Sequence, residues 1–544
     1  MAAFVRKVPR GEFEARVWVL GNLSGKVEMD MFGGLTKTSS RIAIAAALGL
    51  TFGGYTLSYS PANAADFGGD CCADLEERVA ELEATTVRKG NKKVSVTLSG
   101  WVVKSMNFWD DGRISSFAVG DKDADLASRF AITGNATIAP GWTGGFNITV
   151  VAPGNTFGIF GNQFQEFENP VNGGVQGATD HGAIRTLYSY IYIKSDTLGA
   201  LNWGYLSPAS DNPAVLADIS GTVIESNAVF FEGAGFLLRP KGALGNAYDS
   251  LSAISLLNLT NCTNGGGGVG ADCFGAPRPA VRYDSPTWGG FRFETSYGTV
   301  ETERTPDHNF WDIAVFYTAD WNSIKLSAAY AYTHLEHSIG ANCNASFGPT
   351  SSNCGDDQLH QVGASIMHKP SGLGIYGLWQ TELVDGSFFA PYRDSGQQGI
   401  EDTEVWYVKP FWRKAWSPIG ATVLYGEYGR YDDQFAGLAG SDLCFGGFGT
   451  GQLGNSAACG IVVNGGLNTA FMDSSKVERW GLGVVQEIDS AAMHVWARWQ
   501  HQEAEATLKI CDLGNNCFDS SNFDSQKVGF NDWDLFQIGG IIFF

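Results

Sequence analysis

The chain has 544 residues, of which 70 are Gly and only 17% are charged, and its formal net charge is −21. This acidic balance argues against nucleic acid as a partner, because phosphates need neutralising cations. The mean hydropathy of −0.07 indicates apolar side chains diluted among polar neighbours. No segment after residue 65 holds the roughly 20 consecutive apolar residues of a membrane helix.

The first pattern along the chain is an export signal. Lys37 and Arg41 precede an apolar stretch over residues 42–55, and a small-residue Ala-Asn-Ala sequence ends at Ala64. This order of basic, apolar and small residues is typical of a secretory signal peptide that is removed after export. We predict that residues 31–64 form this signal, with cleavage after Ala64.

The segments on either side of the signal have different roles. Residues 1–30 lie upstream of a complete signal and add nothing to it, so we expect a misassigned start and take Met31 as the true one. Residues 65–92 are predicted to be a helix and linker, in which Leu75 and Val79 belong to one seam of a coiled coil. A helix this short is not stable alone. We expect it to pack in the periplasm, either on copies of itself or against the rest of the chain.

From Lys93 onward the hydrophobic period changes from helical to two. Val94 and Val96 alternate with Ser95 and Thr97, which is the pattern of a strand with one apolar and one polar face. Sixteen predicted strands repeat it, at residues 94–109, 128–139, 143–152, 185–195, 199–206, 279–285, 289–299, 310–319, 323–335, 359–368, 373–384, 402–413, 418–431, 476–488, 491–504 and 532–544. In lipid every backbone N–H and C=O group must find a hydrogen-bond partner within the protein, so the strands must close into a ring without a free edge. Residues 93–544 are therefore predicted to be an all-β, 16-stranded antiparallel transmembrane barrel.

The connections between these strands alternate between short and long. Seven are tight turns, and eight are long segments rich in Gly, Asn, Asp and Cys. Outer-membrane barrels have this rhythm, with short turns in the periplasm and long loops outside. The last strand ends in Phe544, the terminal aromatic that barrel-assembly machinery reads as a closing signal, so this machinery and outer-membrane lipid are expected partners.

Charges on the polar parity of the strands indicate a wet interior. Arg282 and Arg292 alternate with Val281 and Phe291, and Lys325 follows the same parity in a later strand. Charges on the enclosed face are incompatible with the dry core of a soluble β-sandwich. A water-filled lumen accommodates them. Both parities are apolar over parts of two strands, at residues 188–193 and 373–381, so the inner face is ambiguous there and we name no pore residues in these stretches.

The ten cysteines fall into an ordered series. Eight form four local pairs, each within one loop segment, and an exported protein meets an oxidising compartment in which such pairs form disulfides. No pair has the spacing and neighbouring His of a zinc site. Cys71 and Cys72 have no assigned partner and stay open. The predicted pairs are Cys262 with Cys273, Cys343 with Cys354, Cys444 with Cys459, and Cys511 with Cys517.

A set of short segments resembles a known family. The segments are DCCADLEERVAELEAT (70–85), KVSVTLSG (93–100), FWDDG (108–112), WG (203–204), SPASDN (207–212), VRYDSP (281–286) and PFW (410–412). Together they are similar to the porins of alphaproteobacteria over residues 65–544, and the cysteine helix is the most specific part of the likeness.

This resemblance implies a 16-stranded, homotrimeric general diffusion porin that passes ions and small hydrophilic solutes. It also implies that the third external loop folds inward and narrows the pore. The corresponding segment is 207–278, the longest connection, and its Ser-Pro onset fits the family pattern. A Gly-rich stretch at 265–268 elaborates this loop.

Pore-constriction candidates follow from the resemblance together with strand parity. The inward-folding loop carries acids, and the barrel wall carries bases on the polar parity. Opposed acidic and basic sides would set a transverse field across the narrowest section. The acidic candidates are Asp211, Asp218, Glu225 and Glu232, and the basic candidates are Arg129, Arg282, Arg292, Lys325, Arg479 and Arg498.

Three alternatives compete with a general porin. A substrate-specific channel for sugars or carboxylates is the rival within transport, and an adhesin or receptor barrel is the rival outside it. An outer-membrane lipase needs a Ser-His pair that we do not find. His334, Glu336 and His337 at a strand end are more typical of chance than of a metal site. We therefore predict no enzyme activity, no catalytic residues, no metal and no cofactor.

Overall fold

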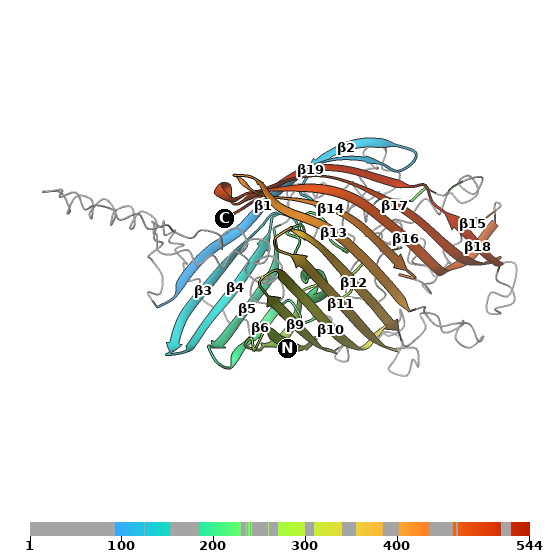
Figure 1. Ribbon diagram of the computed structural model, residues 1–544. Helices are drawn as coiled ribbons and strands as arrows, with labels where there is room; N and C mark the ends of the chain where they lie inside the picture. Colours follow the sequence, from blue (N-terminus) through green and yellow to red (C-terminus); the bar gives the residue numbers. More distant parts are fainter. Residues whose placement is uncertain are drawn as a thin grey trace, which may run out of the picture. The chain divides into compact units, whose positions relative to one another are not determined.

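The computed structural model describes the barrel part of the chain (Figure 1). One of the two compact units of the chain is described only at residues 93–96, and the other contains nearly all of the strands. The described residues are 93–123, 126–152, 184–229, 236, 238–239, 241, 259, 270–299, 309–339, 355–384, 402–434, 461–463, 466–512 and 524–544. The predicted signal, the N-terminal helix, Cys71 and Cys72 lie outside them.

Sixteen long strands form one closed antiparallel ring, which confirms the predicted 16-stranded barrel. In chain order they are β1 (Ser95–Asp110), β3 (Arg129–Ala139), β4 (Trp142–Val151), β5 (Arg185–Ser195), β6 (Gly199–Leu206), β7 (Arg278–Asp284), β8 (Phe291–Thr299), β9 (Asn309–Asp320), β10 (Ile324–Ile339), β11 (Gly355–His368), β12 (Leu373–Val384), β13 (Thr403–Ser417), β14 (Gly420–Asp432), β16 (Gly466–Ile488), β17 (Met493–Asp512) and β19 (Trp533–Phe543). Every predicted strand overlaps one of these.

The ring closes between its first and last strands. β1 pairs with β19 from Trp101 opposite Phe543 to Asp110 opposite Asp534. The Gly100 amide donates to the Phe544 carbonyl at 2.9 Å, so the last residue takes part in the closure. No sheet edge is left open in the ring, as a strand fold in lipid requires.

Three short strands lie outside the ring: β2 (Ser115–Gly120), β15 (Ile461–Val463) and β18 (Asp524–Gly529). They pair with the loop ends of β1, β16 and β17, respectively. β16 and β17 are also longer than predicted, because their pairing with each other continues past the points where β14 and β19 stop. The prediction missed these extensions because a hairpin outside the membrane has no lipid face and needs no apolar alternation.

The outward face of the ring is an apolar band between two aromatic belts. On β13, Trp406 and Trp416 are exposed ten positions apart on one parity, and Trp311 and Trp321 repeat this spacing at β9. Ten residues at about 3.3 Å each, tilted by about 45°, span roughly 23 Å of height. That agrees with the band of about 25 Å expected for an outer-membrane barrel.

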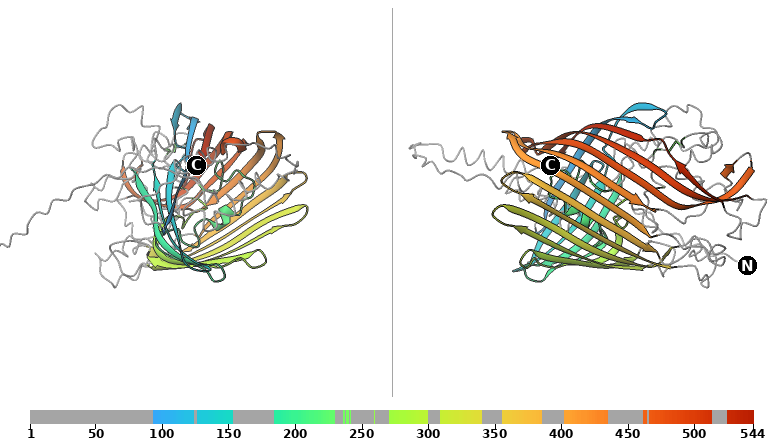
Figure 2. Two further views of the ribbon diagram at one scale, coloured as in Figure 1. Left: turned by 90° about the vertical axis from the view of Figure 1, so that its left-hand side faces the viewer. Right: turned by 45° about the vertical axis from the view of Figure 1, so that its right-hand side comes forward.

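Helices are few in the part of the chain that the structure describes. The named ones are α3 (Pro213–Leu216) and the 3-10 turn η4 (Asp489–Ala491). None among the described residues combines the length and apolar character of a membrane-spanning helix. Figure 2 shows α3 inside the ring of strands, which brings the segment after β6 into the barrel interior.

Candidate functional site

The segment that follows β6 lines the inner wall of the barrel, and we call its described residues (207–229, 236, 238–239, 241, 259 and 270–277) the inward loop. Nearly all of residues 207–229 are buried, although they belong to no strand. They share one packed cluster with inward side chains of the wall. The resemblance to a porin implied such a loop, and its described residues do lie inside the barrel.

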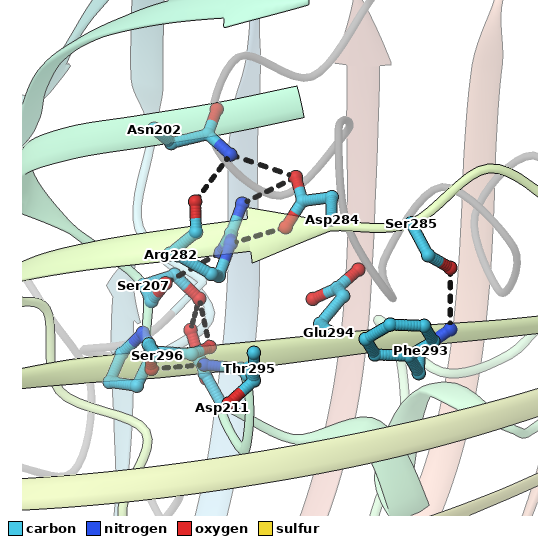
Figure 3. Close-up of polar contacts among 12 residues, drawn as sticks. Asn202, Ser207, Asp211, Arg282, Asp284, Ser285, Phe293, Glu294, Thr295 and Ser296 are labelled. Carbon is cyan, nitrogen blue, oxygen red and sulfur yellow. Dashed lines mark hydrogen bonds and ion pairs between the residues drawn. The ribbon is translucent and has the colours of Figure 1, made fainter. Parts of the chain in front are cut away.

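The start of the inward loop is fixed by a polar cluster on β6 and β7 (Figure 3). Arg282 donates from Nε to Asp284 at 2.8 Å and from Nη1 to the Ser207 carbonyl at 2.6 Å. Asn202 donates to the same Asp284 carboxylate at 3.0 Å. A charged guanidinium that satisfies a loop carbonyl and a carboxylate at once orients the chain where it leaves β6. Arg282 therefore holds the entry of the loop.

The next turn of the loop is bonded to β8, β9 and β11. The Ala209 amide donates to Ser296 at 3.0 Å, and the Ser210 amide donates to Asp312 at 2.8 Å. On β11, Gly363 leaves the space that α3 needs, because a Cβ at that position would lie 2.0 Å from a backbone oxygen of α3. Strand composition thus creates the seat for the loop.

Buried charges hold the middle of the loop. Lys409 of β13 pairs with Asp218 at 2.6 Å and donates to the Ser226 carbonyl at 2.6 Å, and both charged side chains are at most 1% exposed. Further along, His494 of β17 contacts Glu225 at 3.0 Å. Pairs buried in this way position the loop strongly, because releasing one partner leaves an uncompensated charge.

Glu427 of β14 is the centre of a second network under the loop. It accepts hydrogen bonds from the Ser226 hydroxyl, from Tyr407 at 2.5 Å and from Gln500 at 2.9 Å. Arg479 lies 3.8 Å from the same carboxylate and donates to loop carbonyls. The charge of Glu427 is therefore offset by wall and loop groups in direct contact with it.

The predicted constriction residues lie where strand parity placed them. The six basic candidates face inward on β3, β7, β8, β10, β16 and β17, and the three described acidic candidates are buried in the inward loop. Many of these charges touch a partner, such as Arg292 with Glu294 and Asp218 with Lys409. Glu232 lies outside the described residues.

The sequence reasoning missed several inward charges that contact the loop. Parity could have found Glu427, Glu487 and His494, because each shares the inner face with Arg479 or Arg498 on its own or a neighbouring strand, whereas no lumen residue was predicted on β13 or the two strands beside it. Arg413, for example, pairs with Glu487 at 2.5 Å and donates to the Ser220 carbonyl. The missed groups include Asp312, Lys409, Arg413, Glu427, Glu487 and His494.

Tyrosines occupy the stretches where both strand faces are apolar. Tyr188, Tyr190 and Tyr192 of β5 are buried on the inner face, and Ile191 and Ile193 are exposed outside. On β12 the inward residue is a tyrosine as well, and its hydroxyl donates to a backbone carbonyl of α3 at 2.8 Å. The inward positions are therefore aromatic on β5, whereas on β12 Leu378 and Gln380 share the inner face with the tyrosine, and period-two reasoning could not assign either stretch.

Few of the cysteines in the predicted disulfides are among the residues that the structure describes. Cys273 is disulfide-bonded and buried, and Gln380 donates to its sulfur at 2.8 Å. Its expected partner Cys262 lies outside the described residues, as do the side chains of the other paired cysteines. The pairings therefore stay predictions.

One group of side chains at the loop end of β17 could offer ligands to a metal ion. Donor atoms of His501, Glu503 and Asp532 lie within 4.8 Å of one another. His501 already contacts Asp534 at 2.9 Å, and Asp532 pairs with Lys241 at 2.8 Å. These contacts satisfy the group without an ion, and we assign no metal site to it.

The two histidines near the end of β10 are only partly described. The His334 side chain lies 3.8 Å from an aspartate, and the His337 side chain is outside the described residues.

The sequence as a whole matches a known family. The family model described as Gram-negative porin matches residues 60–458. The chain belongs to the Gram-negative porin family. This porin resides in the outer membrane and forms a passive, water-filled channel for ions and small hydrophilic solutes. Porins are channels and not enzymes.

Several solved structures align with most of this chain at low sequence identity. The anion-selective porin from Comamonas acidovorans is 14% identical, with 83% of this chain and 100% of that chain covered and a TM-score of 0.45. OmpT of Vibrio cholerae is 12% identical, with 84% and 99% covered and a TM-score of 0.43. OmpF of Salmonella typhi is 11% identical, with 84% and 99% covered and a TM-score of 0.42. None of the curated proteins matches this porin.

Proposed function

We propose that this porin is a general diffusion channel with weak ion preference. The observation that carries the proposal is the pairing of charge inside the barrel. Acids of the inward loop contact bases of the wall, and wall acids such as Glu427 contact wall bases such as Arg479. Charges in direct contact produce a weaker field along the solute path than separated charges do. A wet interior with such a field sorts solutes mainly by size.

The inner aromatic residues favour general diffusion over a sugar-specific channel. Tyr376 and Tyr431 are buried, and their hydroxyls donate to backbone carbonyls of the inward loop at 2.8 Å and 2.9 Å. Tyr407 donates to the Glu427 carboxylate. Aromatic rings that anchor a loop do not present their faces to a passing sugar. These tyrosines therefore support a structural role for the inner aromatics of β12, β13 and β14.

The constriction is proposed to lie at the inward loop. Residues 207–278 are proposed to be the constricting segment. The groups that set its charge are proposed to be Asp211, Asp218, Glu225 and Glu232 together with the six basic candidates, which are five arginines and Lys325. The support is the burial of the described part of this loop against the inner wall. Because several of these groups are paired, we expect their joint removal to change selectivity more than the removal of any single one.

Assembly and maturation follow the resemblance to alphaproteobacterial porins. We propose a homotrimer in outer-membrane lipid, inserted by barrel-assembly machinery that reads Phe544. The signal over 31–64, the periplasmic helix within 65–92 and the four local disulfides belong to the same proposal. Electrophoresis of the native protein without heating tests the trimer, and mass spectrometry of reduced and unreduced peptides tests the disulfides.

The channel proposal is tested in a planar bilayer with the refolded chain that begins at Ala65. General diffusion predicts large, ohmic conductance steps and a small reversal potential under a KCl gradient. A sugar-specific channel predicts small steps that a particular sugar blocks. A steep reversal potential close to that of one ion would contradict weak preference.

A further inference from the structure

The inward loop makes a second attachment, far from its entry, at the seam where β1 and β19 close the ring. Phe236 is fully buried there between Trp109 and Trp533, with ring centroids 4.8 Å and 5.2 Å away and both pairs edge-on. Trp109 belongs to β1, and Trp533 is the first residue of β19. One loop side chain therefore contacts both strands of the seam.

Two cations of the loop reach carboxylates on either side of the same seam. Arg239 pairs with Asp111, just after β1, at 2.9 Å, and this pair is almost fully buried. Lys241 pairs with Asp532, just before β19, at 2.8 Å, and this pair is about half exposed. Asp111 and Asp532 place negative charge at this end of the seam, and the two loop cations offset it.

Backbone hydrogen bonds complete the attachment. The Asn531 amide donates to the Arg239 carbonyl at 2.6 Å, and the Lys241 amide donates to the Gly529 carbonyl at 2.8 Å. Backbone bonds of this kind fix the path of the loop and not only its side chains. Aromatic, ionic and backbone contacts thus coincide within six residues of the loop.

We propose that Phe236, Arg239 and Lys241 form a clasp that holds the inward loop against the barrel seam and so fixes the conducting cross-section at the loop end. The inference rests on the proposed channel function and adds the residues that set its size limit. Polar contacts hold the loop at its entry on β7 and in its middle on β13 and β14, and the clasp attaches it at the seam of β1 and β19.

The clasp is tested with a double variant, Phe236→Ala with Arg239→Ala. Lys527→Ala is the matched control, because Lys527 also pairs with an acid, Glu505 at 2.9 Å, on an exposed part of the loop end and is not one of the three clasp residues. A change of electrophoretic mobility on heating shows that each variant has folded. In the double variant we expect a larger conductance step with added flicker, and in the control the wild-type trace.

Hydrogen exchange gives a readout that does not depend on current. The Asn531 amide should exchange at least about tenfold faster in the double variant, equivalent to about 1.4 kcal/mol of lost protection. A charge swap, Lys241→Asp with Asp532→Lys, should restore conductance and exchange relative to Lys241→Asp alone, because the exposed pair can re-form with reversed signs.

The outcomes separate the clasp from the channel proposal. A folded double variant with wild-type conductance and wild-type exchange at Asn531 overturns the clasp alone. An equal change in the Lys527→Ala control also overturns it, because the effect would then belong to any loop-end ion pair. Folded wild-type protein that inserts and carries no current overturns the channel function and, with it, the role of the clasp in setting the cross-section.

Discussion

Replacing Lys409 by methionine removes the ion pair that holds the middle of the inward loop. Methionine keeps the length and apolar stem of the side chain but leaves the Asp218 carboxylate buried without its cation. Removal of one partner from a buried pair costs about 3–5 kcal/mol. The Ser226 carbonyl also loses its donor, so we place Lys409→Met in the upper part of that range.

The assay is a double-mutant cycle on protein refolded in detergent, with unfolding followed by denaturant titration. Asp218→Asn in the Lys409→Met background should recover part of the loss, because the uncompensated charge is then absent. Lys325→Met is the matched control, since Lys325 is an inward lysine that makes no ion pair among the described residues. Additive effects of the two changes, or equal losses for Lys409→Met and Lys325→Met, would refute the reasoning.

Three further substitutions test other parts of the fold. Gly363→Val should displace α3 and change the conductance step, whereas Gly377→Ala, where a Cβ would make only an ordinary contact, should leave the step unaltered. Glu427→Gln should shift the reversal potential toward that of chloride, because the arginines beside it lose their counter-charge; the outward-facing Glu404→Gln should not shift it. Leu424→Arg, on the lipid face, should lower the free energy of unfolding in vesicles by about 2–4 kcal/mol, and an unchanged midpoint would contradict its place in the apolar band.

The strands of the ring could be predicted from the sequence because lipid and water impose a strict alternation on them. Phe291 and Arg292 are adjacent, yet one is exposed on the outer face and the other faces Glu294 inside. The extension of β16 beyond β14 escaped prediction, because outside the membrane either face of a hairpin can be polar.

The placement of candidate charges was predictable, but their partners were not. Strand parity put Arg479 on the inner face, and the structure has it there. Its contacts with Asn227 and Val229, about 250 residues away, depend on the path of the inward loop, which no local pattern encodes. The same holds for Phe236, which begins a short apolar run (236–238) in a loop, because no local pattern encodes its position at the seam.

The central claim is that an apolar outer face and a wet, charge-paired interior make this barrel an open channel. Single-channel recording of the folded mature chain in a planar bilayer tests it most directly. We predict stepwise ohmic currents with a reversal potential near zero under a KCl gradient. Repeated insertion of folded protein without any current would contradict the account.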